Sequence, residues 1–179
     1  MTNDVASILL TEAEIKEKIK SLGEIITNDY KDVNSILIIG VLKGSFVFMA
    51  DLIRQIKIPC EIDFMSVSSY KDSTSSSGEV KIQKDITINV AKKNILFVED
   101  IIDTGFTMSK IKEMFFERGA NSIKLCALLN KPDRRNTSVT IDYKGFDIPD
   151  EFVIGYGLDY ADRYRNLPYI GILNPKVYE

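Results

Sequence analysis

The segment ILFVEDIIDTGFTMS, Ile95 to Ser109, decides the fold, because an apolar strand runs directly into acids, a small-residue turn and a helix. Its first four residues form the short continuous apolar run that is typical of a buried parallel strand. The apolar spacing changes toward 3.6 residues from Met108 onward, which is typical of a helix. The segment therefore predicts a strand, a loop and a helix, with the polar residues gathered at the junction.

Three carboxylates, Glu99, Asp100 and Asp103, lie within five positions at the end of the predicted strand. In open α/β sheets, ligands bind at the carboxyl edge of the strands. Like charges this close raise one another's pKa unless a cation or hydroxyl donors compensate. The three acids therefore indicate a metal ion, a polyol or a catalytic proton at this edge.

Two hydroxyls and a glycine follow the acids, in the order Thr104, Gly105, Phe106 and Thr107. They precede a helix start, where backbone N–H groups and the helix dipole favour an anion. In the alternative interpretation, Thr107 is an ordinary N-cap and Gly105 an ordinary turn residue. A strand followed by two acids also opens phospho-receiver domains, but there it lies near the start of the domain, whereas here it begins at Ile95.

The sequence VEDIIDTGFT, Val98 to Thr107, resembles the motif of the purine phosphoribosyltransferases, specifically the hypoxanthine or hypoxanthine-guanine branch of the type I fold. Four further segments match this family in order along nearly the whole chain: Leu42 to Ser45, Ser69-Tyr70, Asn130-Lys131, and Phe152 to Leu167. Five ordered segments are far more specific than one. The resemblance implies an α/β fold with a Rossmann-like central parallel sheet flanked by helices, a small hood subdomain and a flexible β-hairpin flap.

Length and composition agree with one domain spanning residues 1–179. The resemblance implies a flap at about 68–90 and a hood built from the N- and C-terminal segments. A net charge of −3 and a pI near 5.2 argue against nucleic-acid or anionic-membrane partners, which need a basic face. The chain contains no histidine, which excludes Ser-His-Asp and Cys-His catalysis and His-ligated zinc. Carboxylates, lysines and magnesium remain as the chemical groups.

The two cysteines, Cys60 and Cys126, are isolated in apolar surroundings, so we expect buried free thiols in a reducing compartment. The first ten residues lack the basic region and long apolar stretch of a secretory signal. No run reaches the eighteen or so apolar residues of a membrane span. We therefore expect a cytoplasmic protein.

Periodicity and turn residues predict the remaining elements. Thr11 and Glu14 form a capping box before a helix with an apolar stripe, Ile15, Ile19, Leu22 and Ile26. The predicted strands are Ser35 to Gly40, Cys60 to Val67, Ser122 to Leu129, Phe152 to Gly155 and Tyr169 to Leu173, and a helix is predicted from Phe46 to Ile56.

The serine-rich stretch from Ser68 to Gly78 has two interpretations, a passive linker or a flap. Val80 and Ile82, followed by Thr87 and Ile88, suggest a β-hairpin that returns to the core, which favours the flap. Flaps of this kind exclude water from a reaction.

Two lysines occupy loops that leave the same predicted sheet edge. Lys43 offers a cation and Gly44 permits close backbone approach, as a phosphate-contacting loop needs, although an ordinary turn with a solvated lysine is the alternative. Lys131 lies just past a strand end, in a stretch that could be merely a charged surface turn. Tyrosines recur at Tyr156, Tyr160 and Tyr164, which indicates packing rather than nucleic-acid stacking.

The resemblance implies transfer of a 5-phosphoribosyl group from phosphoribosyl pyrophosphate to a 6-oxopurine base. Glu99 and Asp100 would bind the ribose 2′ and 3′ hydroxyls, with Mg²⁺ bridging ribose and pyrophosphate. Asp103 would be the general base or acid at the purine N7. The loop from Asp103 to Thr107, including Thr104, Gly105 and Phe106, would cradle the 5′-phosphate; some members carry lysine in place of Phe106.

The other matching segments imply contacts to the base and the pyrophosphate. Lys131 would donate to the purine O6, Phe152 would stack on the base, and Val153 would contact its edge through the backbone. Arg165 and the Lys43-Gly44 turn would contact pyrophosphate, and in the family this turn often carries a cis peptide before its lysine. Asp159 would hold a second Mg²⁺. Ser69 and Tyr70 would lie in a flap that closes over the pyrophosphate.

Family members are commonly dimers or tetramers, so the resemblance also implies a homodimer or a homotetramer. Two alternatives stay open. A regulator that senses phosphoribosyl pyrophosphate or nucleotides would keep this fold and add a basic face or a DNA-binding domain, neither of which is evident here. A transferase that prefers xanthine, or one that uses a pyrimidine, would stay within the enzyme class.

Overall fold

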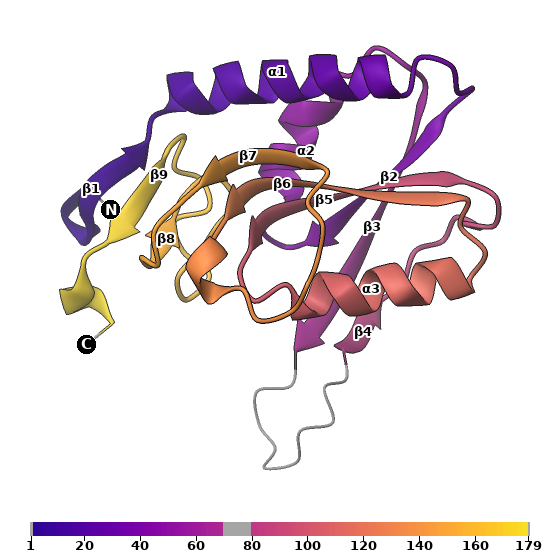
Figure 1. The fold of residues 1–179 in the computed structure, drawn as a ribbon. Helices are drawn as coiled ribbons and strands as arrows, with labels where there is room; N and C mark the ends of the chain where they lie inside the picture. The colour runs from indigo at the N-terminus through magenta and orange to yellow at the C-terminus, as the bar shows by residue number, and fades with distance from the viewer. Residues whose placement is uncertain (1, 70–79, 179) are drawn as a thin grey trace.

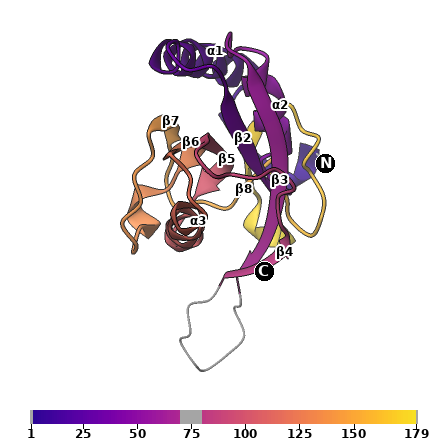
Figure 2. The ribbon, with the colours of Figure 1, turned by 90° about the vertical axis from the view of Figure 1, so that its right-hand side faces the viewer.

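The computed structural model describes residues 2–69 and 80–178, and a six-stranded sheet forms its centre (Figures 1 and 2). The strand order is β4-β3-β2-β5-β6-β7. Every neighbouring pair is parallel except β3 and β4, which are antiparallel. The strands are β2 (Ile36–Leu42), β3 (Cys60–Ser69), β4 (Val80–Lys84), β5 (Asn94–Ile102), β6 (Ser122–Asn130) and β7 (Tyr143–Asp147).

Helices cover both faces of this sheet, as predicted. Along β2, Ile36 and Ile38 point into a core cluster shared with α1 (Glu12–Asp29) and α2 (Phe46–Ile53). Leu37 and Ile39 point the other way, into a second cluster shared with α3 (Phe106–Glu117). A strand buried on both faces reads as a continuous apolar run, which explains why the sequence revealed β2 and β5 so clearly.

The first helix is built as the sequence predicts. The side chain of Thr11 accepts a hydrogen bond from the backbone of Glu14, and the carboxylate of Glu14 accepts one from the backbone of Thr11, so the capping box is confirmed. The predicted apolar stripe is buried: Ile15, Ile19, Leu22 and Ile26. This helix crosses the top of the central sheet in Figure 1 and serves as scaffold.

A second, antiparallel sheet joins the two ends of the chain in the order β1-β9-β8. Its strands are β1 (Val5–Leu10), β8 (Val153–Ile154) and β9 (Ile170–Leu173). It encloses a small cluster of its own, made by Ile154, Tyr164, Leu167 and Leu173. Figure 1 shows this sheet beside one end of the central sheet, and it is built from the N- and C-terminal segments that the resemblance assigns to the hood.

Several boundaries differ from the sequence prediction. Helix α2 ends at Ile53 rather than Ile56, and α3 begins at Phe106 rather than Met108. Thr107 is therefore inside the helix, and Gly105 is its N-cap. Strand β3 reaches Ser69 and pairs with β4, which confirms the hairpin at its described base, whereas the intervening residues 70–79 lie outside the described residues.

The tyrosine-containing segment after β8 is not helical. It is a series of turns and isolated bridges, with positive φ at Tyr156 and Tyr164. Both of those side chains are nevertheless buried, so the packing role is correct while the helical spacing is coincidental. The expectation of free thiols is confirmed; Cys126 is fully buried, but Cys60 is only partly buried.

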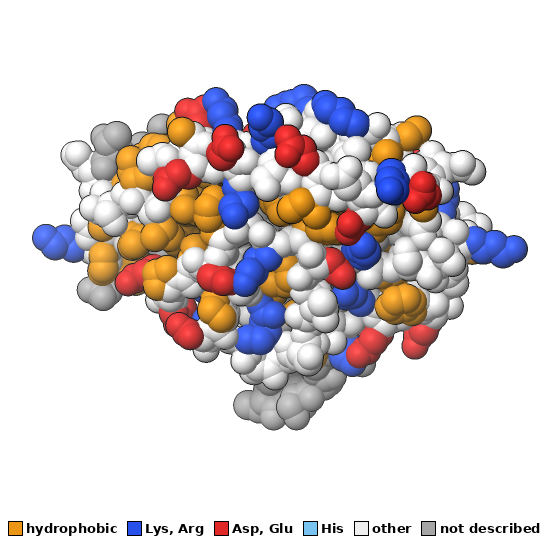
Figure 3. All heavy atoms as spheres, turned by 45° about the horizontal axis from the view of Figure 1, so that its top comes forward, with side chains coloured by type: hydrophobic (Ala, Val, Ile, Leu, Met, Phe, Trp, Pro, Cys, Tyr) orange, Lys and Arg blue, Asp and Glu red, His pale blue; other side chains and the backbone are white. Residues whose placement is uncertain are grey.

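The surface shown in Figure 3 carries lysine, arginine, aspartate and glutamate interspersed with apolar areas, the broadest of which lies in the left half of the view. This mixture differs from the single-sign basic face of a nucleic-acid-binding surface. Among the described residues, no helix combines the length and the hydropathy that a membrane-spanning segment needs.

Candidate active site

A cavity of about 230 Å³ opens at the carboxyl ends of β2 and β5. This is the edge of a parallel sheet where ligands generally bind. Seven of the residues predicted to bind substrate line it: Gly44, Glu99, Asp100, Asp103, Thr104, Gly105 and Thr107. The loops expected to bind ribose, 5′-phosphate and pyrophosphate therefore meet at one cavity.

Glu99 and Asp100 give this cavity an unusual electrostatic character. Glu99 is only 8% exposed, and burial together with the adjacent Asp100 raises its pKa well above the usual range. Burial likewise raises the pKa of Asp100, to about 6. Two desolvated neighbouring carboxyls hold protons more tightly than free acids, so a cation or a pair of hydroxyl donors would be favoured here.

The β2 loop approaches Asp100 so closely that only glycine fits. A Cβ added to Gly44 would lie 1.6 Å from Oδ2 of Asp100. On its other side, the carbonyl oxygen of Gly44 would lie 2.1 Å from a Cβ added to Gly157. The peptide bond between Leu42 and Lys43 is cis, as the family resemblance led us to expect.

The loop between β5 and α3 presents a helix N-terminus to the cavity. Gly105 is the N-cap and adopts a left-handed conformation with φ of +84°, which favours glycine. The hydroxyl oxygen of Thr104 accepts a hydrogen bond from the N–H of Phe106 at 3.4 Å. The first N–H groups of α3 lack partners within their own helix, which suits an anion.

Arg135 braces this loop from the neighbouring segment and was missed by the sequence analysis. Its Nε donates to the carbonyl oxygen of Asp103 at 3.1 Å, and a terminal nitrogen donates to the side-chain oxygen of Asn130. The backbone N–H groups of Asn136 and Thr137 both donate to the carbonyl oxygen of Thr104. The sequence signal was only a pair of adjacent arginines after a strand, which does not distinguish a brace from a surface turn.

Lys131 lies against the acidic loop, as predicted from its place after β6. Its backbone N–H donates to the carbonyl oxygen of Ile102 at 3.0 Å, and its side chain is only 12% exposed. The ammonium lies 3.3 Å from Oδ1 of Asp150. Asp103, meanwhile, accepts a hydrogen bond from Arg134 at 3.2 Å.

The segment after β7 contributes a set of rings and charges. Phe152 is 41% exposed and stacks on Tyr178 with ring centroids 5.5 Å apart, while Val153 is buried at the start of β8. Arg165 pairs with Asp159 at 2.7 Å and donates to the carbonyl oxygen of Gly157. Because Gly157 packs against Gly44, this segment adjoins the β2 loop.

The remaining predicted residues are Lys43, Ser69, Tyr70 and Asp159. Lys43 is exposed and forms an ion pair with Asp162 at 3.0 Å. Ser69 ends β3 and pairs with Val80, whereas Tyr70 lies outside the described residues. Within residues 2–69 and 80–178, no group of three or more carboxylate or cysteine side chains gathers into a metal site, so Asp159 does not join Glu99 and Asp100 in one cluster.

Residues 5–161 match the family model described as the phosphoribosyl transferase domain. The chain belongs to the phosphoribosyltransferase family. The matched region contains the whole cavity and both glycine loops. The central sheet with helices on both faces, the second sheet at its edge and the β3–β4 hairpin accordingly form the type I phosphoribosyltransferase fold.

The phosphoribosyltransferase chain is similar over its full length to proteins named for one activity. It is 54% identical to the hypoxanthine-guanine phosphoribosyltransferase of Bacillus subtilis, covering 100% of this chain and 99% of that protein. A crystal structure of a hypoxanthine phosphoribosyltransferase from Staphylococcus aureus superposes with a TM-score of 0.95 at 48% identity, covering 100% and 97% of the two chains. A mutant of the Trypanosoma cruzi enzyme, in a ternary substrates complex, has a TM-score of 0.93 at 40% identity, covering 99% and 100%.

Proposed function

We propose that the protein is a purine salvage enzyme that transfers the 5-phosphoribosyl group from phosphoribosyl pyrophosphate to hypoxanthine. The products are inosine monophosphate and pyrophosphate, and guanine is a second acceptor that gives guanosine monophosphate. The observation that carries the proposal is the cavity where the acid pair, the phosphate loop and the Gly44 loop meet, in a chain similar over its full length to enzymes named for this activity.

The transition state at the ribose explains why acids surround the cavity. Cleavage at the anomeric carbon builds an oxocarbenium-like charge, as in glycoside hydrolysis, and carboxylates beneath the ribose stabilise it. Glu99 and Asp100 accept hydrogen bonds from the 2′ and 3′ hydroxyls. These hydrogen bonds offset the free-energy cost of burying two carboxyls side by side. The backbone and hydroxyls from Asp103 to Thr107 hold the 5′-phosphate at the start of α3.

Asp103 and Lys131 act on the base. Asp103 accepts the N7 proton as the purine attacks through N9, and Lys131 donates to O6. Adenine carries an amino group at that position, which cannot accept the bond, so the site selects 6-oxopurines. Phe152 stacks on the base and Val153 contacts its edge through the backbone.

Pyrophosphate is held by Arg165 and by the Lys43-Gly44 loop, and Ser69 and Tyr70 belong to the flap that closes over it. Enzymes of this family generally require a metal ion, and we propose Mg²⁺, with Glu99 and Asp100 at one site and Asp159 at a second. The donor set suits it, because Mg²⁺ prefers one or two carboxylates together with substrate phosphates. When bound, it neutralises charge on the leaving pyrophosphate.

Other assignments remain open to the same experiments. A nucleotide-sensing regulator that binds nucleic acid is disfavoured, because the similarity to named transferases is full-length and the net charge of the chain is −3. A preference for xanthine stays an alternative for the base. The cytoplasmic location and the homodimeric or homotetrameric assembly stay predictions.

The deciding experiment measures initial rates of pyrophosphate release with hypoxanthine, guanine, xanthine and adenine, each with Mg²⁺ and then with a chelator. We expect turnover with hypoxanthine and guanine, almost none with adenine, and loss of activity on chelation. Binding of RNA and DNA is measured in parallel at moderate salt. Tight nucleic-acid binding without any pyrophosphate release would overturn the enzyme assignment in favour of a regulator.

A further inference from the structure

Arg134 and Asp150 connect Asp103 with Lys131, the two side chains proposed to contact the purine. Nε of Arg134 donates to Oδ1 of Asp103 at 3.2 Å. A terminal nitrogen of Arg134 lies 3.6 Å from Oδ2 of Asp150, and Oδ1 of Asp150 lies 3.3 Å from the ammonium of Lys131. The four charges therefore alternate in sign along one continuous chain, which we call the purine-side charge chain.

The purine-side charge chain joins loops that come from different strands. Asp103 follows β5 and Lys131 follows β6. Arg134 ends the short 3-10 helix Pro132–Arg134, and Asp150 lies in the segment between β7 and β8, two positions before Phe152. Every loop proposed to touch the base is therefore connected to the next through a side-chain contact.

The members of the purine-side charge chain differ in how far they are buried. The side chain of Lys131 is 12% exposed, whereas those of Asp103, Arg134 and Asp150 are 44%, 51% and 47% exposed. An ammonium taken this far out of water needs an opposite charge beside it, and Asp150 supplies one. Oδ2 of Asp103 has no hydrogen-bond partner within the part of the chain that the structure describes, so this oxygen remains available for a ligand.

Stability does not explain the two ion pairs of Arg134. Ion pairs between half-exposed side chains typically contribute between about 0 and 1 kcal/mol, because solvent screens them and the side chains lose entropy. Arg134 nevertheless commits its Nε to Asp103, and that hydrogen bond raises the pKa of Arg134. What the contacts do provide is orientation: the planar guanidinium fixes a carboxylate, and a carboxylate fixes the flexible ammonium of a lysine.

We propose that Arg134 and Asp150 are positioning residues that hold Asp103 and Lys131 as one unit, set for the N7–H and the O6 of a 6-oxopurine. This inference rests on the proposed function of the same site. Arg134 occupies Oδ1 of Asp103 and leaves Oδ2 to receive the N7 proton, while Asp150 restricts Lys131 to the direction of O6. A misplacement of about 1 Å in such a site costs on the order of 100-fold in rate.

The test compares Arg134→Gln, Asp150→Asn and the double variant with the unmodified enzyme, using hypoxanthine and phosphoribosyl pyrophosphate. We expect each single change to raise KM for hypoxanthine by on the order of tenfold, while KM for phosphoribosyl pyrophosphate stays within about twofold. Arg134→Gln also lowers kcat, and Arg134→Lys restores it in part because it keeps the charge but loses the planar fork. Because both residues belong to the purine-side charge chain, the double variant loses less kcat/KM than the product of the two single losses.

Arg54→Gln is the matched control, since Arg54 is an exposed arginine paired with Asp51 on α2, outside the charge chain. It leaves both KM values unchanged. If the unmodified enzyme is active and both Arg134→Gln and Asp150→Asn keep its KM for hypoxanthine, the inference is overturned while the proposed function stands. A large fall in the midpoint of thermal unfolding in Arg134→Gln, whose two ion pairs are both half-exposed, would also overturn it, because those contacts would then be structural. Absence of activity in the unmodified protein with every base would instead overturn the proposed function.

Discussion

Asp103 illustrates how one residue can contact two neighbours at once, one through its backbone and one through its side chain. Its backbone carbonyl accepts a hydrogen bond from Arg135, which braces the phosphate loop, and its carboxylate accepts one from Arg134. The first contact does not depend on the side chain of Asp103. Removing its carboxylate charge should therefore separate proton transfer from binding of the sugar phosphate.

We accordingly predict that Asp103→Asn lowers kcat by about 10²- to 10⁴-fold, the usual contribution of a general base. The affinity for phosphoribosyl pyrophosphate should be nearly unchanged, because the loop backbone keeps its brace. Steady-state kinetics and direct binding of phosphoribosyl pyrophosphate measure the two effects separately. Asp133→Asn, an exposed aspartate in the neighbouring 3-10 helix, serves as the control. Unchanged turnover in Asp103→Asn would remove Asp103 from the role of base.

Gly44 tests the close approach of two loops. In Gly44→Ala, the new Cβ would lie 1.6 Å from Oδ2 of Asp100, so the carboxylate or the loop must move. We predict that affinity for phosphoribosyl pyrophosphate falls by on the order of tenfold or more, since both groups are displaced from the cavity. Isothermal titration calorimetry measures the loss, and thermal unfolding measures the strain. Adding Asp100→Ala should relieve the clash and restore the unfolding midpoint without restoring affinity; a midpoint that fails to recover would contradict this account.

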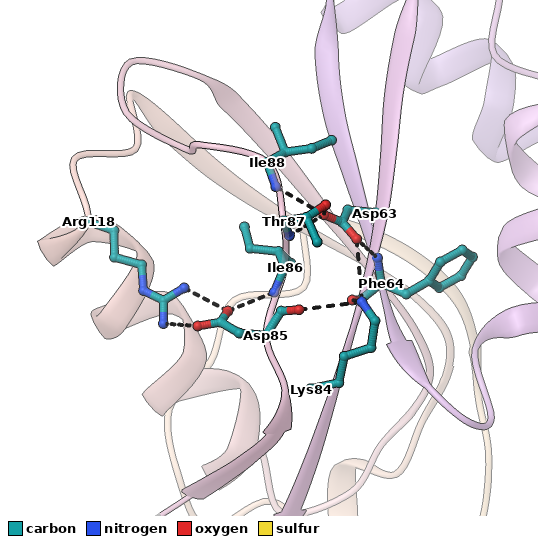
Figure 4. A network of polar contacts seen from close by, with 8 residues as sticks. All are labelled: Asp63, Phe64, Lys84, Asp85, Ile86, Thr87, Ile88 and Arg118. Carbon is teal, nitrogen blue, oxygen red and sulfur yellow. Dashed lines mark hydrogen bonds and ion pairs between the residues drawn. The ribbon is translucent and has the colours of Figure 1, made fainter.

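Among the secondary-structure elements, the β3–β4 hairpin is held at its base by buried charge. Oδ2 of Asp63, on β3, accepts hydrogen bonds from the backbone N–H groups of Thr87 and Ile88 at 2.6 and 3.2 Å (Figure 4). Asp85 then forms two hydrogen bonds with Arg118, at the end of α3. The segment that follows β4 is thus fixed between a strand and a helix, although it forms no strand of its own.

This network makes a prediction about acid stability. Hydrogen bonds to its carboxylate outweigh the cost of burial and lower the pKa of Asp63 to about 2, from an ordinary value near 3.8. A group whose pKa is lower in the folded state contributes stability that is fully present above the unfolded pKa and is lost as pH falls toward 2. The contribution is about 2 kcal/mol. Asp63→Asn should remove it, so that urea unfolding at pH 7 shows a matching loss that shrinks as pH falls from about 4 to 2.

Asp32→Asn, which changes an exposed aspartate far from the hairpin, is the control for that measurement. It should leave the pH dependence as it is. If Asp63→Asn and the unmodified protein lost stability in parallel across this range of pH, the network would not stabilise the fold through its charge.

The elements differ in how far the sequence could predict them. β2 and β5 are continuous apolar runs buried on both faces, and such a pattern has few alternatives. β7, with the sequence YKGFD, is the outermost strand on one side of the central sheet. It mixes charged residues, glycine and aromatic residues, so no apolar periodicity revealed it. β1 escaped notice because it pairs only with β9, at the opposite end of the chain.

At the level of the whole molecule, the site depends on contacts between loops that are distant in sequence. The cavity-lining acids follow from the strand-to-helix motif alone. The contacts of Arg134 with Asp103 and Asp150, and the packing of Gly157 on Gly44, depend instead on how three loops and the second sheet are placed in space. Sequence patterns report local periodicity and strand ends, so they locate the edge of the site but not its cross-connections.

A site assembled from so many segments predicts that substrate stabilises the entire fold. A ligand that binds only the folded state adds RT ln(1 + [L]/Kd), about 2.7 kcal/mol at 100 times Kd. For a chain of this length that corresponds to roughly 5 to 10 °C in the midpoint of thermal unfolding. We expect this shift with phosphoribosyl pyrophosphate and Mg²⁺ together and a much smaller one with a chelator, because without the cation the charge of the pyrophosphate beside the two carboxyls is not neutralised. Ribose 5-phosphate, which lacks the pyrophosphate, is the control and should be insensitive to chelation. An equal shift with and without chelator would show that the acid pair holds the ribose through hydrogen bonds alone.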